Sequence, residues 1–308
     1  MRSSAYYYFL VCFSFPVFAQ KDHSYLKQNS AIDNSIPKNF VPPSKYGPCV
    51  SMANLKEALK NPLIYVGANF YNCGLNSVPP EIFLFPNLME IDLSHNSITS
   101  LPDQFKNVKN LIELHLANNL LTELGTEITS CKKLEVLYIQ NNSLKIISPE
   151  IGKMTSLKKL WIENTDKKCR VPAEVWKLTN LRELHLIDVN LDEVPSKISS
   201  FHQLYDVCFA RNNISSIPDE LFQLNKITYL NLGYNKIKNV SPLLKNLVNL
   251  DYLGIYGNPI QEIPGEIEKL KKLSFLSCWN TNMNEVEIEN AVKLLPGTKV
   301  HFTPDSIH

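Results

Sequence analysis

The sequence repeats an apolar pattern every 23 residues from about residue 63 to residue 286, with a single step of 24 residues. In the clearest turn, Ile91 and Leu93 lie two positions apart, which places both side chains on one face of a strand. A single turn cannot bury that face alone, so neighbouring turns must stack. The period therefore predicts a solenoid of ten turns, whose first apolar positions are Tyr65, Leu88, Leu111, Leu134, Leu157, Leu181, Leu204, Ile227, Leu250 and Leu273.

The full pattern resembles the consensus of the leucine-rich-repeat family, in its short 23-residue bacterial and Ras-suppressor-like class. One turn carries this pattern as Leu88, Ile91, Leu93, Asn96, Ile98, Leu101 and Pro102. The resemblance implies an α/β solenoid, a right-handed horseshoe of ten repeats over residues 63–286, with a parallel sheet on its concave side. It also implies short 3₁₀ or helical segments on the convex side, which we expect to start at Pro102, Pro172, Pro195, Pro218 and Pro264.

Six turns carry an asparagine at the same position, namely Asn96, Asn119, Asn142, Asn212, Asn235 and Asn258. A side-chain amide donates and accepts hydrogen bonds at once. We therefore expect this asparagine ladder to satisfy backbone groups inside the body, where an unpaired group is costly.

The fifth and sixth turns depart from the pattern, because Thr165 and Val189 occupy the asparagine position and the step between these turns is the long one. A buried turn left unsatisfied costs about 1–3 kcal/mol. We expect Asn164 or Asn190 to shift and cover the gap. Tolerated drift and a bend adapted to a partner both remain open as explanations.

Both ends of a solenoid need caps, because an exposed sheet end invites pairing with another chain. Residues 49–62 form the expected N-terminal cap, with a short amphipathic helix over residues 52–60 and Ser51 as its N-cap. Residues 287–308 form the expected C-terminal cap. There the pattern predicts a helix from Glu285 to Leu295, stopped by Pro296, and an edge strand over residues 299–302.

The first 19 residues have the order of a secretory signal peptide, with Arg2, an apolar run over residues 5–17 and Ala19 at the cleavage site. The run is short for a membrane span, although a retained anchor is the alternative. Residues 20–48 are rich in Ser, Asn, Lys and Pro and predict a linker without regular structure. We therefore expect a secreted, periplasmic or cell-surface protein of a bacterium.

The charge balance gives no reason to expect a polyanionic partner. Lys and Arg number 31 and Asp and Glu number 30, for a net charge of +1. Such a balance favours neither nucleic acid nor an anionic membrane surface. We expect no nucleic-acid partner, no cofactor and no membrane insertion once the signal is removed.

Aromatic residues gather at strand positions that the predicted fold leaves open on the concave face. Tyr and Trp concentrate binding energy at protein interfaces. The alternative is that the rings only stack and stiffen the sheet. The candidate partner-binding residues are Tyr138, Trp161, His185, Tyr229, Tyr234, Tyr252, Tyr256, Phe275 and Trp279.

A row of His185, Cys208 and Asn231 on neighbouring strands suggests a thiol triad. In such a triad the histidine lies between the nucleophile and the orienting group, whereas here the cysteine is in the middle. We predict no catalytic residues and no enzyme activity.

Two Glu-Leu-His-Leu runs place Glu113 with His115 and Glu183 with His185. The runs lie three repeats apart, about 14 Å at strand spacing, too far to share an ion. Neither run alone reaches three ligands, so we predict no metal site.

Cysteine spacing allows few disulfides. Of the six cysteines beyond the signal segment, only Cys49 and Cys73 lie close enough in the predicted fold to be bridged, and six free thiols are the alternative. The leading hypothesis is non-enzymatic binding of a protein or peptide on the concave face. The alternatives are a cell-surface adhesion or glycan-binding protein, and an intracellular signalling scaffold if the signal segment is not cleaved.

Overall fold

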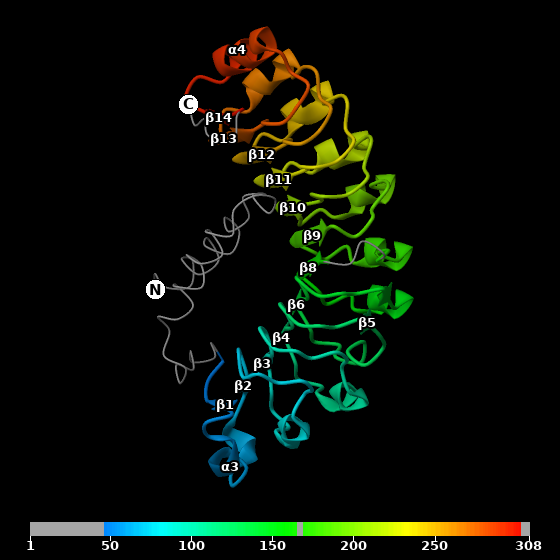
Figure 1. The fold of residues 1–308 in the computed structure, drawn as a ribbon, viewed down its shortest axis with the longest axis vertical. Helices are drawn as coiled ribbons and strands as arrows, with labels where there is room; N and C mark the ends of the chain where they lie inside the picture. The colour runs from blue at the N-terminus through cyan, green and yellow to red at the C-terminus, as the bar shows by residue number, and fades with distance from the viewer. Residues whose placement is uncertain (1–45, 165–168, 303–308) are drawn as a thin grey trace. The chain divides into compact units, whose positions relative to one another are not determined.

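The computed structural model describes residues 46–164 and 169–302, which form one solenoid body (Figure 1). Twelve parallel strands follow one another in chain order along its inner side. The expected signal segment and nearly all of the expected linker lie outside the described residues. The strands of the sheet are β1 (Cys49–Ser51), β2 (Gly67–Asn69), β3 (Glu90–Asp92), β4 (Glu113–His115), β6 (Val136–Tyr138), β8 (Lys159–Glu163), β9 (Glu183–Ile187), β10 (Asp206–Cys208), β11 (Tyr229–Asn231), β12 (Tyr252–Gly254), β13 (Phe275–Ser277) and β14 (Lys299–His301).

The register of the sheet follows the repeat of the sequence. Ile91 pairs with Leu114, and Leu114 pairs with Leu137 on the next strand. The leading leucines Leu88 and Leu111 are 0% exposed, as the apolar interior of a stacked solenoid requires. The predicted fold class is therefore confirmed, with ten repeat strands and one further strand from each end.

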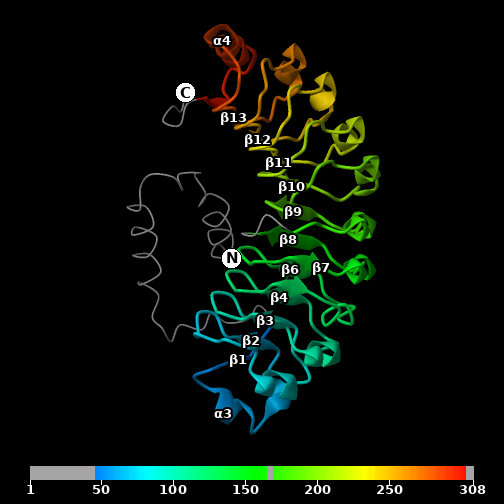
Figure 2. The ribbon, with the colours of Figure 1, turned by 45° about the vertical axis from the view of Figure 1, so that its right-hand side comes forward.

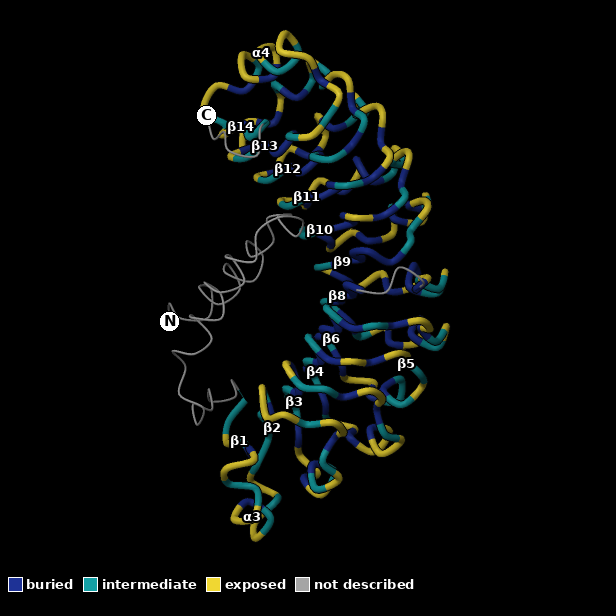
Figure 3. The backbone as a smooth tube through the Cα atoms, viewed as in Figure 1, coloured by how far each residue is buried: buried dark blue, intermediate teal, exposed yellow. Residues whose placement is uncertain are grey.

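Short 3₁₀ segments return the chain along the convex side, where the exposed positions concentrate (Figures 2 and 3). As expected, prolines introduce them: Pro102, Pro172, Pro195, Pro218 and Pro264 each occupy the N-cap. The turns at residues 123–147 also pair as a small second sheet of β5 (Glu123–Leu124) and β7 (Ile146–Ile147). The segments are η1 (Pro62–Ile64), η2 (Pro80–Leu84), η3 (Asp103–Asn107), η4 (Pro149–Lys153), η5 (Ala173–Lys177), η6 (Ser196–Ser200), η7 (Asp219–Gln223), η8 (Pro242–Asn246) and η9 (Gly265–Lys269).

The N-terminal cap differs from the sequence-based expectation. A strand, β1, comes first, and the helix α3 (Leu55–Ala58) is shorter than residues 52–60. Ser51 is not its N-cap, because Asn54 holds that position and its Oδ1 accepts a hydrogen bond from the Ser51 backbone N–H at 2.7 Å. Pairing of β1 with β2 uses the Ser51 backbone in the sheet, so the helix begins later. Cys49 and Cys73 are not joined by a disulfide in this structure.

The helix and the edge strand expected near the C-terminus are both present, each one residue shorter than predicted. Helix α4 (Glu285–Leu294) begins at the N-cap Asn284, whose Oδ1 accepts a hydrogen bond from the Glu287 N–H at 3.0 Å. Strand β14 then pairs with β13 and ends the sheet. Within the described residues, no helix has the length and apolar character that crossing a membrane requires.

The ladder asparagines tie each turn to the one before it. The Oδ1 of Asn119 accepts a hydrogen bond from the Ile98 N–H at 3.0 Å, and its Nδ2 donates to the Leu93 carbonyl at 2.9 Å. The same two contacts recur five turns later between Asn235, Ile214 and Phe209. Each amide thus satisfies a donor and an acceptor of a neighbouring buried turn.

In the irregular fifth turn, an asparagine one position before the ladder position makes hydrogen bonds to the preceding turn. Asn164 is 1% exposed, its Oδ1 accepts from the Leu144 N–H at 2.7 Å, and its Nδ2 donates back to the Leu144 carbonyl at 2.8 Å. Asn164 therefore takes the hydrogen-bonding role that the ladder asparagine has in the regular turns. In the following turn, the buried Val189 donates its N–H to Asn212 Oδ1 at 3.1 Å.

Candidate functional site

Every three-residue strand turns its middle residue inward and its outer two residues to the concave face. In β4 these outer residues are Glu113 and His115, with Leu114 buried between them. We call the positions equivalent to Glu113 the first column and those equivalent to His115 the central column. The residue two positions after the central column, such as Tyr256 or Trp279, forms the third column. Side chains within a column are neighbours because adjacent strands pair in register.

The C-terminal part of the concave face carries two aromatic stacks. The first stack lies in the first column, where the rings of Tyr229 and Tyr252 are 4.5 Å apart at 10° and those of Tyr252 and Phe275 are 5.6 Å apart at 11°. The second stack lies in the third column, where Tyr256 and Trp279 are 5.4 Å apart at 2°. These rings cover three neighbouring turns.

Tyr234 closes the second stack from the side. Its ring meets that of Tyr256 at 5.4 Å and that of Trp279 at 5.7 Å, both nearly edge-on. Gly257, at φ +64°, lies against the Tyr234 ring, and a Cβ built there would come within 2.6 Å of it. All six C-terminal aromatic candidates of the sequence therefore belong to one continuous surface.

Small central-column residues allow the two stacks to approach each other. Gly254 and Ser277 lie between them and are buried, as are Cys208 and Asn231. The Nδ2 of Asn231 donates to the Tyr256 hydroxyl at 3.2 Å and to the Tyr229 hydroxyl at 3.4 Å. Asn231 thus joins the stacks and orients two of their hydroxyl groups.

Burial raises the pKa values of these tyrosine hydroxyls. The pKa of Tyr256 rises to about 12, and those of Tyr229 and Tyr252 rise further above their ordinary value. The hydroxyls, neutral at physiological pH as in any tyrosine, therefore stay neutral to still higher pH.

The middle of the concave face is more closed than the sequence indicated. The rings of Tyr138 and Trp161 pack edge to face at 6.1 Å, and Trp161 meets His185 at 4.8 Å. Tyr138 and His185 are only 7% and 6% exposed, so the expectation of open side chains at these two positions is wrong. Bulky neighbours at strand spacing cover one another, which the residue types alone do not reveal.

The thiol row does not have the geometry of a triad. Cys208 is buried, and the His185 Nε2 atom lies 2.8 Å from Asp206 Oδ1. The histidine is thus engaged by a carboxylate of the neighbouring strand. The absence of catalysis stays a prediction.

A polar cluster at the N-terminal end was missed by the sequence analysis. Glu90 stands beside Glu113 in the first column, and ligand atoms of Glu90, Glu113 and His115 all lie within 4.8 Å of one another. The missed signal was the 23-residue spacing itself, which places Glu90 next to Glu113. Our expectation counted ligands within one Glu-Leu-His-Leu run and not across two turns.

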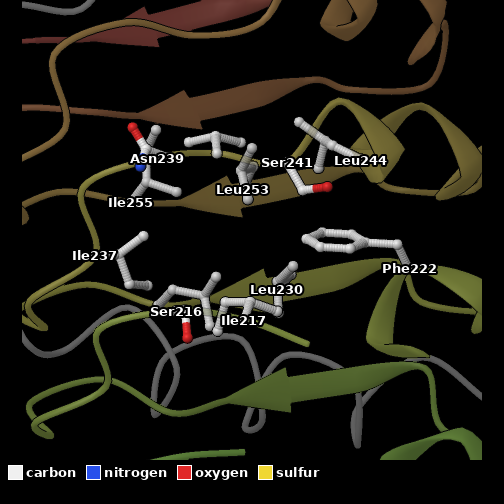
Figure 4. A pocket seen from close by; sticks show the side chains of 12 residues that line it. Ser216, Ile217, Phe222, Leu230, Ile237, Asn239, Ser241, Leu244, Leu253 and Ile255 are labelled. Atoms are coloured by element: carbon white, nitrogen blue, oxygen red, sulfur yellow. The ribbon is translucent and has the colours of Figure 1, made fainter. Parts of the chain in front are cut away.

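A cavity of about 210 Å³ lies inside the body between the turns of β11 and β12 (Figure 4). Apolar side chains such as Phe222, Leu244 and Leu253 make up most of its lining, and Ser216, Asn239 and Ser241 add polar groups. None of its lining side chains titrates. The cavity therefore offers space without groups for chemistry.

Two family models match the sequence, one described as a leucine-rich repeat region over residues 86–187 and one as leucine rich repeat over residues 202–260. Together they cover more than half of the chain, and the chain belongs to the leucine-rich-repeat family. Among curated proteins, none matches the sequence at a significant level.

Solved structures share the fold. An internalin (inlF) from Listeria monocytogenes has a TM-score of 0.62 at 19% identity, over 82% of this chain and 70% of that one. The Arabidopsis receptor kinase HAESA ectodomain, in complex with an IDA peptide hormone ligand, has a TM-score of 0.60 at 23% identity, over 68% of this chain and 38% of that one.

The plant peptide hormone receptor RGFR1, in complex with RGF2, has a TM-score of 0.54 at 28% identity, over 67% of this chain and 38% of that one. This chain therefore spans well under half of either plant receptor structure.

Proposed function

We propose that this protein recognises a peptide or protein on the C-terminal part of its concave face. The observation that carries the proposal is the pair of aromatic stacks on β11, β12 and β13, joined by Asn231. A preformed aromatic surface loses little conformational entropy when a partner docks. The RGFR1 and HAESA structures, which hold peptide ligands on the same type of solenoid, add support.

The orientation of the rings favours peptide over glycan. Tyr229 and Tyr252 stack nearly parallel at 4.5 Å, about the spacing of adjacent strands, so each ring face is covered by its neighbour. Ring edges then remain for the partner. The positive edge of an aromatic ring suits backbone carbonyl groups, whereas a sugar that stacks on an aromatic residue needs an open ring face.

The test is selection from a random peptide library on the immobilised wild-type chain, followed by affinity measurement of the enriched peptides. We expect a Tyr252→Ala/Trp279→Ala variant to bind them at least thirtyfold more weakly, because hot-spot truncations cost about 2 kcal/mol or more. Tyr71→Ala is the matched control, since Tyr71 occupies the third column at the other end of the sheet. Its affinity should equal that of the wild type.

Equal binding of the enriched peptides by the double variant would contradict the proposed site. A glycan array probed with the same three proteins provides the competing outcome. Binding of a glycan by the wild type and Tyr71→Ala, without any enriched peptide, would replace the peptide proposal with a glycan-binding one.

We also propose that the protein is exported. The support is the order of residues 1–19, with Arg2, the apolar run and the small residue Ala19. N-terminal sequencing of the protein isolated from its native cells is the test. A mature chain that starts near Gln20 supports export, and a chain that starts at Met1 in the cytoplasm contradicts it.

A further inference from the structure

The cluster of Glu90, Glu113 and His115 lies on the first and central columns of β3 and β4, five strands from the first aromatic stack. Its three side chains come from two adjacent turns and converge, with ligand atoms within 4.8 Å of one another. Glu113 is buried, with a side chain 7% exposed. A carboxylate removed from water in this way requires strong compensation from neighbouring groups.

The His115 Nε2 atom is a buried polar group of the cluster that lacks a hydrogen-bond partner. It is shielded from solvent, has no hydrogen-bond partner in the structure and lies 3.6 Å from Glu113 Oε2, beyond hydrogen-bond range. The other carboxylate oxygen, Oε1, accepts a hydrogen bond from the Tyr46 hydroxyl at 3.0 Å. Tyr46 therefore orients the Glu113 carboxylate with Oε2 toward the imidazole.

We propose that Glu90, Glu113 and His115 bind a divalent transition-metal ion such as Zn²⁺. Two carboxylates and one imidazole are a donor set that this class of ion accepts. Bond lengths of about 2.0–2.2 Å put two tetrahedral ligands roughly 3.4 Å apart, close to the separation of Nε2 and Oε2. Glu90 is half-buried, and its ligand atom lies within 4.8 Å of those of Glu113 and His115. The Tyr46 hydrogen bond to a metal-binding carboxylate is typical of groups that orient ligands from outside the coordination sphere.

The electrostatic surroundings favour a cation at this place. Glu90 and Glu113 converge on His115, and Asp92 pairs with His115 on the neighbouring strand. The negative charge of these three carboxylates attracts a metal ion.

The second Glu-Leu-His-Leu run provides an internal comparison. There Glu183 forms an ion pair with Lys159 at 2.6 Å, and His185 Nε2 is bonded to Asp206 at 2.8 Å. The neighbouring turns thus satisfy both side chains within the protein. In one turn the Glu and His of this four-residue motif are placed to bind a metal ion. In the other turn they are bonded to side chains of the protein, because the neighbouring residues differ.

The experiment is a titration of the reduced full chain with Zn²⁺ in a calorimeter and with Co²⁺ in a spectrophotometer. We expect one site, with affinity at least tenfold weaker in His115→Ala and in the milder Glu90→Gln. The variant His185→Ala is the matched control and should bind as the wild type does. Thermal unfolding of each variant shows that it is folded before its affinity is compared.

Co²⁺ distinguishes the proposed ligands from the cysteine thiols. We expect visible d–d bands without an intense thiolate-to-cobalt charge-transfer band. Appearance of that band, unchanged affinity in His115→Ala and Glu90→Gln, or no binding by the wild type would each overturn the proposal. If His115→Ala loses metal binding but retains peptide binding, the metal site is independent of the aromatic site.

Discussion

The ring of Tyr256 lies directly over Gly233 of the preceding turn, so close that a Cβ on Gly233 would fall 2.3 Å from the ring atom Cζ. Glycine at this position therefore allows the ring to pack against the backbone of the preceding turn and to stack on Trp279. One missing side chain thus determines the geometry of the second stack.

We expect Gly233→Ala to displace the Tyr256 ring and to lower the free energy of unfolding by about 1–3 kcal/mol, as overpacking does. Near-ultraviolet circular dichroism measures the change in the stack, and denaturant unfolding measures stability. Gly265→Ala is the control, because a Cβ there meets nothing within 4 Å. An unchanged aromatic spectrum in Gly233→Ala would contradict this account.

The ladder asparagines should be among the most sensitive polar positions. Asn119→Ala removes the partner of the buried Ile98 N–H. The Leu93 carbonyl loses one of two donors and keeps Asn96 Nδ2 at 2.8 Å. Because an unsatisfied buried group costs about 1–3 kcal/mol, we expect a loss of about 1–3 kcal/mol in denaturant unfolding. Asn249 also bonds to a neighbouring turn, at 2.8 Å, but this hydrogen bond is exposed to solvent, and replacement of Asn249 by alanine should change stability by less than about 0.5 kcal/mol. Similar losses for both variants would refute the special role of the ladder.

The exposed cysteine should be alkylated faster than the buried ones. Cys73 is exposed, whereas Cys131 and Cys278 are 1% exposed, and burial raises their pKa values to about 11 and about 12. At pH 8 we expect an alkylating reagent, followed by peptide mass spectrometry, to modify Cys73 first. Burial and the nearby Asp92 raise the pKa of Cys73 as well, so its rate should keep rising beyond pH 9.

The same pKa shifts predict how stability depends on pH. A thiol whose folded pKa is raised contributes stability that is present below its unfolded pKa and is lost as pH rises through the folded value. For Cys131 this window runs from about pH 9 to about pH 11. Stability should therefore fall over that range, and less steeply in Cys131→Ala. A steeper fall in the variant would contradict the assignment.

The interior cavity should accept a larger side chain. Leu244 lines the cavity and occupies the same place in η8 as Phe105 does in η3, so the fold already accommodates a ring at this position. We expect Leu244→Phe to raise the free energy of unfolding by about 0.5–2 kcal/mol. Leu221→Phe, at the equivalent place in η7, does not face the cavity and should lower stability by about 1–3 kcal/mol. If both substitutions stabilised the protein, filling of the cavity would not be the reason for the gain in stability.

The repeat in the sequence was sufficient to predict the strands, the buried positions and the ladder. Each turn places residues such as Leu114 and Asn119 in the same environment as their equivalents one period away, so a local pattern repeated ten times determines them. The displaced Asn164 was also predictable, because a buried turn must find a hydrogen-bond partner nearby.

Only the tertiary structure decided which side chains of neighbouring turns meet on the concave face. It brought Glu90 to Glu113 and His115, buried Tyr138 and His185, and joined the two aromatic stacks through Asn231. The N-terminal cap also depended on pairing between β1 and β2, which lies outside the repeat. The physical reason is that burial of the interior follows the period along the chain, whereas contacts on the open face depend on the size, rotamer and charge of residues that are adjacent only after the turns have stacked.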